Sequence, residues 1–499
     1  MNLKKYMIYL LPLAFVACEP EFDDVKFEAG AADFSRTVAV GNSLTAGFQS
    51  NALSAEGQIN SLPNIVAEQL KIVGGGEFKQ AIIPGEAGEK GAGLANELSP
   101  LGFLAPELKL ALVEDCKMET SLAPTFLPSG FDTIPLPFPP PQDKAAVPKS
   151  RYSAAQFLSN VSNDGPYHNL GIPGAKITDI NNTSYGNAYY SRMAISGESM
   201  VQAAVKTNPT FFMLWIGNND VLGYATSGGA GSVTASGDFN SALTQTLDAL
   251  TANNAKGVIA NIPDITSIPF FTTVKWNALE LTAEQATALN GAYTTYNNAV
   301  EGNRAVIGDA EADRRKINFS AGTNAFVVLD GSLQDLEDGS GNIIPDFKLR
   351  QMTNRELLTL TTPSDDIKCM GFGSFNQSTS KYNPITENYL IDENELSIIN
   401  SAISSYNTTI QNEATVRGLA LVDAYALLKE LSTTGINING ISFTSDFITG
   451  GAFSLDGVHP STRGYAIIAN DFIKAINSTF GANVPQVDVA DYPTYEVTQ

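Results

Sequence analysis

The chain has 499 residues, of which 43% are hydrophobic, so it is long enough for one large domain with insertions or for two domains. It contains 30 lysines and arginines against 52 aspartates and glutamates, which gives a formal net charge of −22. This charge would repel a polyanion, and no basic stripe interleaved with aromatic residues occurs, so the sequence argues against a nucleic-acid partner.

The N-terminus is typical of an export signal. Lys4 and Lys5 form a short cationic start, and the apolar stretch that follows, residues 6–16, is too short to remain in a bilayer as a spanning helix. The stretch ends in the sequence FVAC, residues 15–18, which resembles a bacterial lipobox. An ordinary secreted protein that is cleaved nearby is the alternative.

The lipobox resemblance implies a lipid anchor. Residues 1–17 would be the signal peptide, Cys18 would be the lipidated first residue of the mature protein, and residues 18–35 would form a linker. The acidic stretch EPEFDD, residues 19–24, is similar to export tags on surface lipoproteins of Bacteroides-like bacteria. We therefore expect a protein anchored in the bacterial outer membrane, and the sequence leaves its exposure at the cell surface open.

Strand-like and helix-like runs alternate along the rest of the chain, a pattern typical of a parallel sheet covered by helices. The predicted strands are residues 37–40, 211–216, 257–262, 325–329 and 419–422. The predicted helices are residues 64–73, 239–252, 283–300, 395–413 and 462–476. Ser61, which precedes Pro63, and Ser461 are suitable residues for helix starts. The pattern predicts an α/β fold.

Two long excursions interrupt the alternation, at residues 95–150 and 331–392. The first contains the run PLPFPPP and is expected to be extended and poor in helix. Cys116 lies in the first excursion and Cys369 in the second. These two thiols are too few for a metal cluster, but they can form one disulfide in an oxidising compartment. Two free buried cysteines are the alternative.

The second excursion begins with a turn-rich acidic segment. The spacing of Asp and Asn in residues 330–346 is similar to that of a calcium loop, but it misses the full pattern, so a solvated turn is the better interpretation. A short self-similarity also relates residues 289–300 to residues 399–410. Two copies make no repeat array, and we expect both to be amphipathic helices that pack on the sheet.

The first stretch with chemical potential is TVAVGNSLTAGF, residues 37–48. Its β-branched and small residues predict a buried strand, and Gly41 allows a tight turn after it. Ser43 then stands just beyond the strand end, where α/β folds place their chemistry. The alternative is that Ser43 only caps the next helix, which serine does well.

Two further stretches follow in the middle of the chain. In NLGIPGAKITDI, Gly174 allows backbone to approach a substrate, or it only permits a turn. In FFMLWIGNND, an apolar strand ends at a polar turn that contains Asn219. The Asn219 amide can donate to a developing oxyanion if it stands at the carboxyl end of the strand. A polar turn without function is the alternative.

The last stretch is Asp456-Gly457-Val458-His459-Pro460. A carboxylate three residues before an imidazole can accept a hydrogen bond from His Nδ1, fix the tautomer and stabilise the imidazolium that forms when Nε2 takes a proton. The sequence has only two histidines, which gives this pair more weight. The alternative is a turn histidine with an incidental acidic neighbour.

Together the four stretches resemble the SGNH, or GDSL, family of serine ester hydrolases. The resemblance implies a three-layer α/β/α, flavodoxin-like parallel sheet with two long insertions, extending over residues 36–480 and followed by a tail, residues 481–499. It implies a triad in which Ser43 is the nucleophile, His459 the base and Asp456 its orienter, and an oxyanion hole from the backbone N–H groups of Ser43 and Gly174 and the side chain of Asn219. Residues 261–271, NIPDITSIPFF, are similar to the segment after the fourth strand in larger lipase-like members.

The implied reaction cleaves a carboxylic ester, borne by a small molecule or a polymer, and needs no cofactor. The family name carries Asp where this chain has Asn42, which keeps the side-chain bonds of a turn and loses the charge. No Gly-x-Ser-x-Gly elbow occurs, and no metal site is expected, because zinc needs more ligands than His168, His459 and scattered cysteines supply. We expect His168 to lie at a strand end near the pocket and not to act as the base.

The main rival comes from another functional class. A surface lipoprotein with the same fold could bind glycan or lipid without turnover, although a binder has no need for Ser43, Asn219, Asp456 and His459 together. The sequence leaves the substrate open among acetylated polysaccharide, short esters and phospholipid.

Overall fold

The computed structural model describes residues 26–83, 108–125, 159–494 and 497–498. Its centre is a five-stranded parallel sheet with the strand order β15-β6-β5-β1-β4. The bounds of these strands are β1 Thr37–Gly41, β4 Asn169–Gly171, β5 Phe211–Trp215, β6 Lys256–Ala260 and β15 Ala420–Val422. β1 and β5 are buried along their whole length, as expected for strands covered on both faces. The predicted strands at 37–40, 211–216, 257–262 and 419–422 are confirmed.

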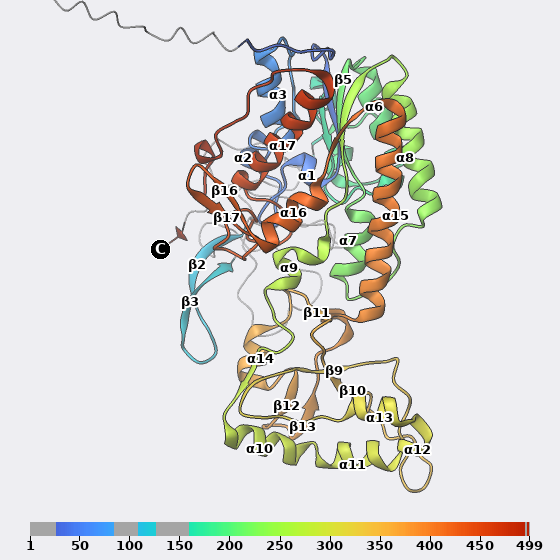
Figure 1. The fold of residues 1–499 in the computed structure, drawn as a ribbon, viewed down its shortest axis with the longest axis vertical. Coiled ribbons are helices and arrows are strands. Elements are labelled where there is room, and N and C mark those ends of the chain that lie inside the picture. Colours follow the sequence, from blue (N-terminus) through green and yellow to red (C-terminus); the bar gives the residue numbers. More distant parts are fainter. Residues whose placement is uncertain (1–25, 84–107, 126–158, 495–496, 499) are drawn as a thin grey trace, which may run out of the picture.

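Helices cover both faces of this sheet and make a three-layer α/β/α body (Figure 1). One face is covered by α3 (Leu62–Ile72) and α17 (Thr462–Phe480), which contact each other, and the other by α6 (Met200–Lys206), α8 (Ser236–Thr251) and α15 (Glu393–Arg417). The helices predicted at 64–73, 239–252, 395–413 and 462–476 are confirmed. The Ser461 hydroxyl caps α17 by accepting from Gly464 N at 3.0 Å, whereas Ser61 precedes α3 without a side-chain cap bond.

Short elements complete the α/β body. They are α1 Ser43–Ala46, α2 Ala55–Ile59, α5 Ala188–Met193, α7 Asn219–Thr226, α9 Pro269–Thr272, α16 Ala424–Thr433, β16 Ile436–Ile438 and β17 Ile441–Phe443. Within the described ranges, no helix is both long enough and apolar enough to cross a bilayer.

A second hydrophobic core, which we call the lower core, gathers buried residues from Leu279 to Leu390 and lies below the α/β body in Figure 1. It therefore begins well before residue 331, where the sequence placed the start of the excursion. Its elements are β7 Leu279–Leu281, α10 Ala283–Ala292, α11 Thr294–Gly302, α12 Arg304–Ile307, α13 Asp309–Arg315, β8 Gly322–Asn324, β9 Val327–Leu329, β10 Leu349–Gln351, β11 Leu357–Leu358, α14 Ser364–Met370, β12 Ser374–Asn376, β13 Lys381–Asn383 and β14 Leu390–Ile391.

Two predictions for the sheet are wrong because of the lower core. The strand expected at 325–329 is β9, which pairs antiparallel with β10 outside the main sheet. The helix expected at 283–300 is divided into α10 and α11 at Tyr293, and its buried face packs in the lower core, so only the second copy of the self-similar pair lies against the main sheet. Periodicity shows that a helix has a buried face, but it does not identify the surface that covers that face.

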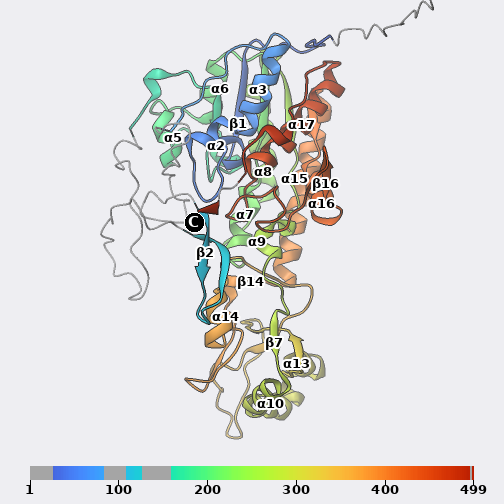
Figure 2. The same cartoon turned by 90° about the vertical axis from the view of Figure 1, so that its left-hand side faces the viewer.

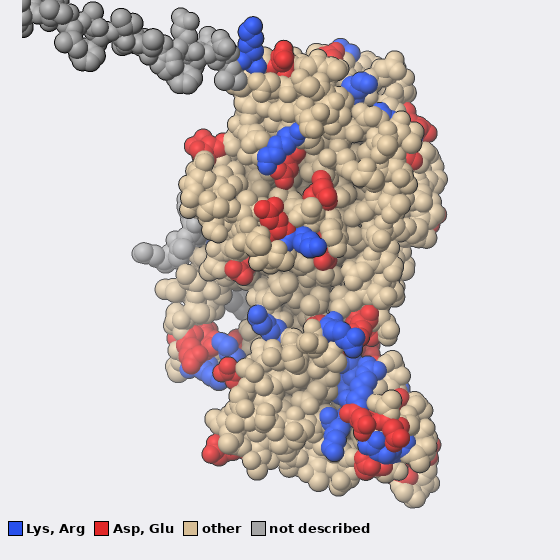
Figure 3. Space-filling model, in the orientation of Figure 1, with Lys and Arg blue, Asp and Glu red and all other residues tan. Residues whose placement is uncertain are grey.

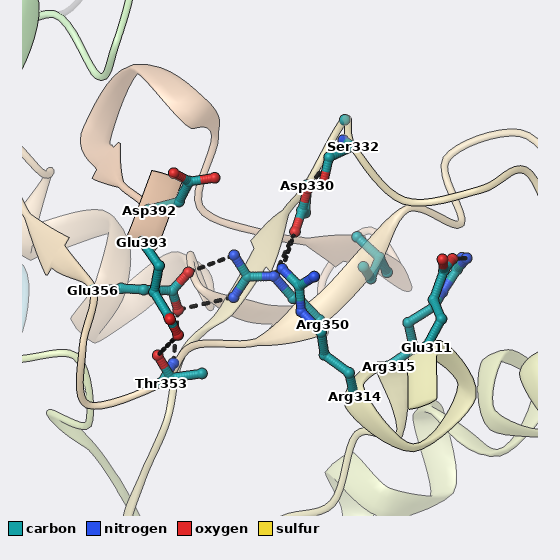
Figure 4. Close-up of polar contacts among 12 residues, drawn as sticks. Glu311, Arg314, Arg315, Asp330, Ser332, Arg350, Thr353, Glu356, Asp392 and Glu393 are labelled. Atoms are coloured by element: carbon teal, nitrogen blue, oxygen red, sulfur yellow. Dashed lines mark hydrogen bonds and ion pairs between the residues drawn. The ribbon is translucent and has the colours of Figure 1, made fainter. Parts of the chain in front are cut away.

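Buried ion pairs hold the lower core together (Figure 4). The Arg350 guanidinium, 1% exposed, donates from Nε to Asp330 Oδ2 at 2.6 Å and from Nη1 to Glu356 Oε2 at 2.8 Å. Arg314 donates to the same Asp330 oxygen at 2.8 Å. Further along the acidic segment, Asp338 Oδ1 accepts from the backbone of Ser340 and Asn342, which makes that part a tight turn, as the sequence suggested.

A β-hairpin links the α/β body to the lower core (Figure 2). It consists of β2 (Lys109–Glu114) and β3 (Thr120–Thr125), and these described residues of the first excursion contain no helix, whereas residues 95–107 and 126–150 lie outside the description. The turn carries Cys116, which is disulfide-bonded to Cys369 of α14. The predicted disulfide between the two excursions is confirmed.

Residues on both flanks of the α/β body pack into its core, although the sequence predicted a linker before it and a tail after it. Ala32 and Phe34 are buried in the main core, although the sequence assigned residues 18–35 to a linker. After α17, Val484 and Val489 are buried against the same core, and β18 (Val497–Thr498) pairs with β2. The folded body therefore extends beyond the predicted limits of 36 and 480, because apolar side chains on both flanks find places in the core.

Candidate active site

Three of the predicted site residues follow neighbouring strands at one edge of the sheet. Gly41, at the end of β1, is paired with Gly171 of β4 on one side and with Trp215 of β5 on the other. Because the strands are parallel, the loops that carry Ser43, Gly174 and Asn219 leave the sheet at the same carboxyl edge. This edge is where open α/β sheets place their ligands.

Ser43 is the first residue of α1, and Asn42 rather than Ser43 is the cap of this helix. The Asn42 side-chain oxygen accepts from Leu44 N at 3.0 Å, and its Nδ2 donates to Asn218 Oδ1 at 3.2 Å. An aspartate at this position could accept the first bond but could not donate the second. The bond from Asn42 to Asn218 therefore gives a physical reason for an asparagine, rather than an aspartate, at position 42.

The turn before Ser43 requires a glycine. A Cβ on Gly41 would lie 2.4 Å from the Trp215 carbonyl oxygen and 2.1 Å from Thr45 Oγ1. The close approach of β5 and α1 to this point leaves no room for a side chain. Gly41 thus allows Ser43 to stand directly above the strand end.

Ser43, His459 and Asp456 form a continuous chain of hydrogen bonds. His459 Nε2 lies 2.9 Å from Ser43 Oγ, and His459 Nδ1 lies 3.0 Å from Asp456 Oδ2. Ser43 and His459 are 416 residues apart in the sequence, and both are buried. The serine hydroxyl can therefore pass its proton to an imidazole that the carboxylate holds in the required tautomer.

Asp456 is held by more donors than the histidine alone. Its Oδ1 accepts from the backbone N–H groups of Val458 and His459 and from the Ser454 hydroxyl, each at 2.9 Å. Its Oδ2 also accepts from Asn51 N at 2.9 Å. Burial alone would raise the pKa of Asp456, but the charge and hydrogen bonds of His459 and the backbone donors lower this pKa to about 2. The carboxylate therefore stays ionised throughout the neutral range.

Several supporting residues were not predicted from the sequence. Besides Asn51 and Ser454, Phe48 packs its ring on His459 with centroids 4.7 Å apart, and the Tyr465 hydroxyl donates to the Phe48 carbonyl at 2.7 Å. Asn51, Phe48 and Tyr465 carry no local spacing signal, because each reaches the site through tertiary packing. A serine two residues before the aspartate was the one detectable clue.

The turn from Asp456 to His459 is also bonded to segments outside the main sheet. The Gly457 carbonyl accepts from Phe270 N at 2.9 Å, and the Phe270 carbonyl accepts from Leu360 N at 2.7 Å. Gly457 has φ of +71°, in the left-handed region that favours glycine. Residues of α9 and of the segment after β11 thus hold the turn between Asp456 and His459.

Asn219 binds the loop that carries Gly174 across the same edge of the sheet. Gly174 has φ of +83°, and Asn219 Nδ2 donates to the carbonyl of the next residue, Ala175, at 3.0 Å. Asp220, 1% exposed, accepts from Ile177 N at 3.0 Å. Burial raises the pKa of Asp220 to about 6, although this backbone bond acts in the opposite direction. The first turn of α7 therefore positions the Gly174 loop through two side chains.

His168 lies away from this site, contrary to the expectation that it would be near the pocket. It precedes β4 at the amino end of the strand, and its carbonyl accepts from Ala39 N at 2.7 Å. Its Nδ1 accepts from Lys79 N at 2.8 Å. Burial lowers the pKa of His168. These bonds give it a structural role, and the expectation that it is not the base is consistent with its position.

The comparison with protein families points to the same chemistry. Residues 142–339 match the family described as GDSL-like Lipase/Acylhydrolase. The matched range contains Gly174 and Asn219, whereas Ser43, Asp456 and His459 lie outside it. No curated protein matches the chain. The match supports ester hydrolysis in general. The chain is similar to GDSL-like lipases and acylhydrolases over this range, and it has the α/β fold of an SGNH hydrolase.

Proposed function

We propose that the protein hydrolyses carboxylic esters through an acyl-enzyme formed on Ser43. The observation that carries this proposal is the hydrogen-bonded chain from Ser43 through His459 to Asp456. An isolated serine hydroxyl is a weak nucleophile, and an adjacent base held by a third group is what activates it. The geometry alone does not identify the ester.

The proposed reaction has two stages. His459 Nε2 takes the proton of Ser43 as Oγ attacks the ester carbonyl, and the protonated imidazole then gives this proton to the departing alcohol. Water attacks the acyl-enzyme in the second stage, again with His459 as the base. The negative charge on the carbonyl oxygen is stabilised by the backbone N–H groups of Ser43 and Gly174 and by the Asn219 amide. The scheme uses no cofactor.

Asn219→Ala is expected to lower kcat on p-nitrophenyl acetate by about 10²-fold, because one oxyanion donor is lost. The bond from Asn219 to the Ala175 carbonyl uses one of the two amide hydrogens, so the other remains for the substrate. His168→Ala is the matched control and is expected to be mild. Equal rates for Asn219→Ala and the native protein would remove Asn219 from the oxyanion hole.

A binding protein without turnover is the second candidate, and the site does not favour it. A glycan or lipid surface requires no base within hydrogen-bond distance of a buried serine, and no carboxylate fixed by four donors besides the imidazole. On the face drawn in Figure 3, lysine and arginine side chains lie among acidic ones and form no continuous basic strip. The expectation that the chain does not bind nucleic acid stays a prediction.

We further propose that the protein is a bacterial outer-membrane lipoprotein, anchored through Cys18, which lies outside the described residues. The FVAC sequence after a short apolar stretch supports this. Cys18→Ser is expected to abolish lipid attachment and to move the protein from the detergent phase to the aqueous phase in a detergent partition. Cys116→Ser, which leaves Cys18 in place, is the control. A Cys18→Ser protein that is processed and retained by membranes like the native form would contradict the anchor.

A further inference from the structure

An apolar cavity of about 80 Å³ lies beside the segments that carry the proposed nucleophile and base. Leu44, the residue after Ser43, lines it, and so does Val458, the residue before His459. The other walls come from the end of β5, the segment after β6, and helices α16 and α17, which lie next to each other in Figure 1. Residues that flank Ser43 and His459 in the sequence thus form part of the cavity wall.

The side chains that line this cavity offer no free polar group. Every residue that lines it is apolar or aromatic, and the Trp215 indole N–H already donates to the Asn261 carbonyl at 3.1 Å. A sugar or another hydroxyl-bearing group would lose its hydrogen bonds to water here without replacement, which costs free energy. A hydrocarbon chain would gain from burial instead.

The volume limits the length of that chain. A water-sized group occupies roughly 10–15 Å³ on this measure, so the cavity holds about five to eight groups of that size. An acetyl group would leave most of it unfilled, and a long fatty acyl chain would extend beyond it. Leu427 and Ile468 are only partly buried, so the outer wall opens toward solvent and a longer chain can extend outward there.

We propose that this cavity, the acyl cavity, binds the acyl chain of the ester and makes the protein selective for saturated acyl groups of about six carbons. The proposal rests on the proposed esterase function and specifies its substrate class. Each buried methylene contributes about fourfold in binding, so a hexanoyl group is expected to exceed an acetyl group by at least tenfold in kcat/KM.

Two isomeric esters test which end of the substrate enters the cavity. Ethyl hexanoate and hexyl acetate have the same atoms, but the long chain is on the acyl side in the first and on the alcohol side in the second. At substrate concentrations well below KM, the native protein is expected to hydrolyse ethyl hexanoate at least tenfold faster than hexyl acetate. Equal rates, or a preference for hexyl acetate, would overturn the assignment of the cavity to the acyl chain.

Ile468→Trp tests the cavity itself, because a larger side chain on its outer wall reduces the space. The ratio of kcat/KM for ethyl hexanoate to that for hexyl acetate is expected to fall by at least tenfold. Val416→Trp, on an exposed position of α15, adds the same side chain elsewhere and is expected to keep the native ratio. Near-native melting temperatures would show that both variants fold.

The outcomes separate the two proposals. A native protein that hydrolyses both esters, with a ratio that Ile468→Trp leaves unchanged, overturns the acyl cavity and leaves the esterase proposal standing. A folded native protein that hydrolyses neither ester and does not react with a serine-directed phosphonylating reagent overturns both.

Discussion

Replacing Ser43 or His459 with alanine is expected to lower kcat/KM on simple esters by on the order of 10³-fold or more. Ser43→Ala removes the atom that attacks the carbonyl. His459→Ala leaves the hydroxyl with no base at 2.9 Å to accept its proton. In both variants the oxyanion donors remain, so some catalysis over water is expected to persist. Initial rates on p-nitrophenyl acetate and hexanoate measure the loss.

The double variant distinguishes a triad from two independent contributions. Because the serine and the histidine act as one unit, Ser43→Ala combined with His459→Ala is expected to be no slower than either single variant. His168→Ala, at the other end of β4, serves as the histidine control. A Ser43→Ala protein that retains a tenth or more of the native rate would contradict the proposed nucleophile.

Arg350→Met is expected to destabilise the lower core by about 3–5 kcal/mol, because it leaves Asp330 and Glu356 buried with charges that have lost their main partner. A loss of this size is a large fraction of the stability of a typical domain. Arg350→Lys is expected to be intermediate, since lysine keeps the charge and loses the bidentate contact. Denaturant unfolding followed by tyrosine fluorescence measures the change.

Arg304→Met, on α12 at the surface of the lower core, is the matched control. Arg304 also pairs with three carboxylates, Glu301, Asp309 and Asp313, but at the surface, where such pairs contribute little. We therefore expect little measurable change in unfolding. Equal effects of Arg350→Met and Arg304→Met would contradict the importance of the buried network.

The same network predicts how stability depends on pH. Burial alone would raise the pKa of Asp330, but the hydrogen bonds from Arg350 and Ser332 outweigh it and hold this pKa below its ordinary value. A carboxylate whose folded pKa is below its unfolded pKa contributes stability that is complete above the unfolded value and is lost as the pH falls through the folded one. The gap between native and Arg350→Met stability is thus expected to narrow in acid.

The parts of the fold that the sequence predicts well are those with local signals. The buried strand before Gly41 and the cap at Ser461 can be recognised from a few consecutive residues. Asp456 and His459 are three residues apart, so their contact requires only one turn. The pairing of Cys116 with Cys369 was predictable because the number of thiols left few partners.

The lower core was not predictable because it depends on partners that are distant in sequence. The apolar face of residues 283–300 has the same periodicity whether it packs on the main sheet or in the lower core. In the same way, Asn51 reaches Asp456 across 405 residues, through a backbone N–H that any residue would have. The sequence pattern predicted that His168 lies near the pocket because it marks the end of a strand. It does not show whether this is the amino end or the carboxyl end.

Labelling with a fluorophosphonate tests the central claim most directly, because such a probe reacts with a serine that an adjacent base activates and requires no knowledge of the substrate. The native protein is expected to be labelled at Ser43, as peptide mapping would show, and Ser43→Ala is expected to lose the label. His459→Ala should be labelled far more slowly. A folded native protein that takes up no probe, or a Ser43→Ala protein that is labelled like the native one, would contradict the proposed serine hydrolase.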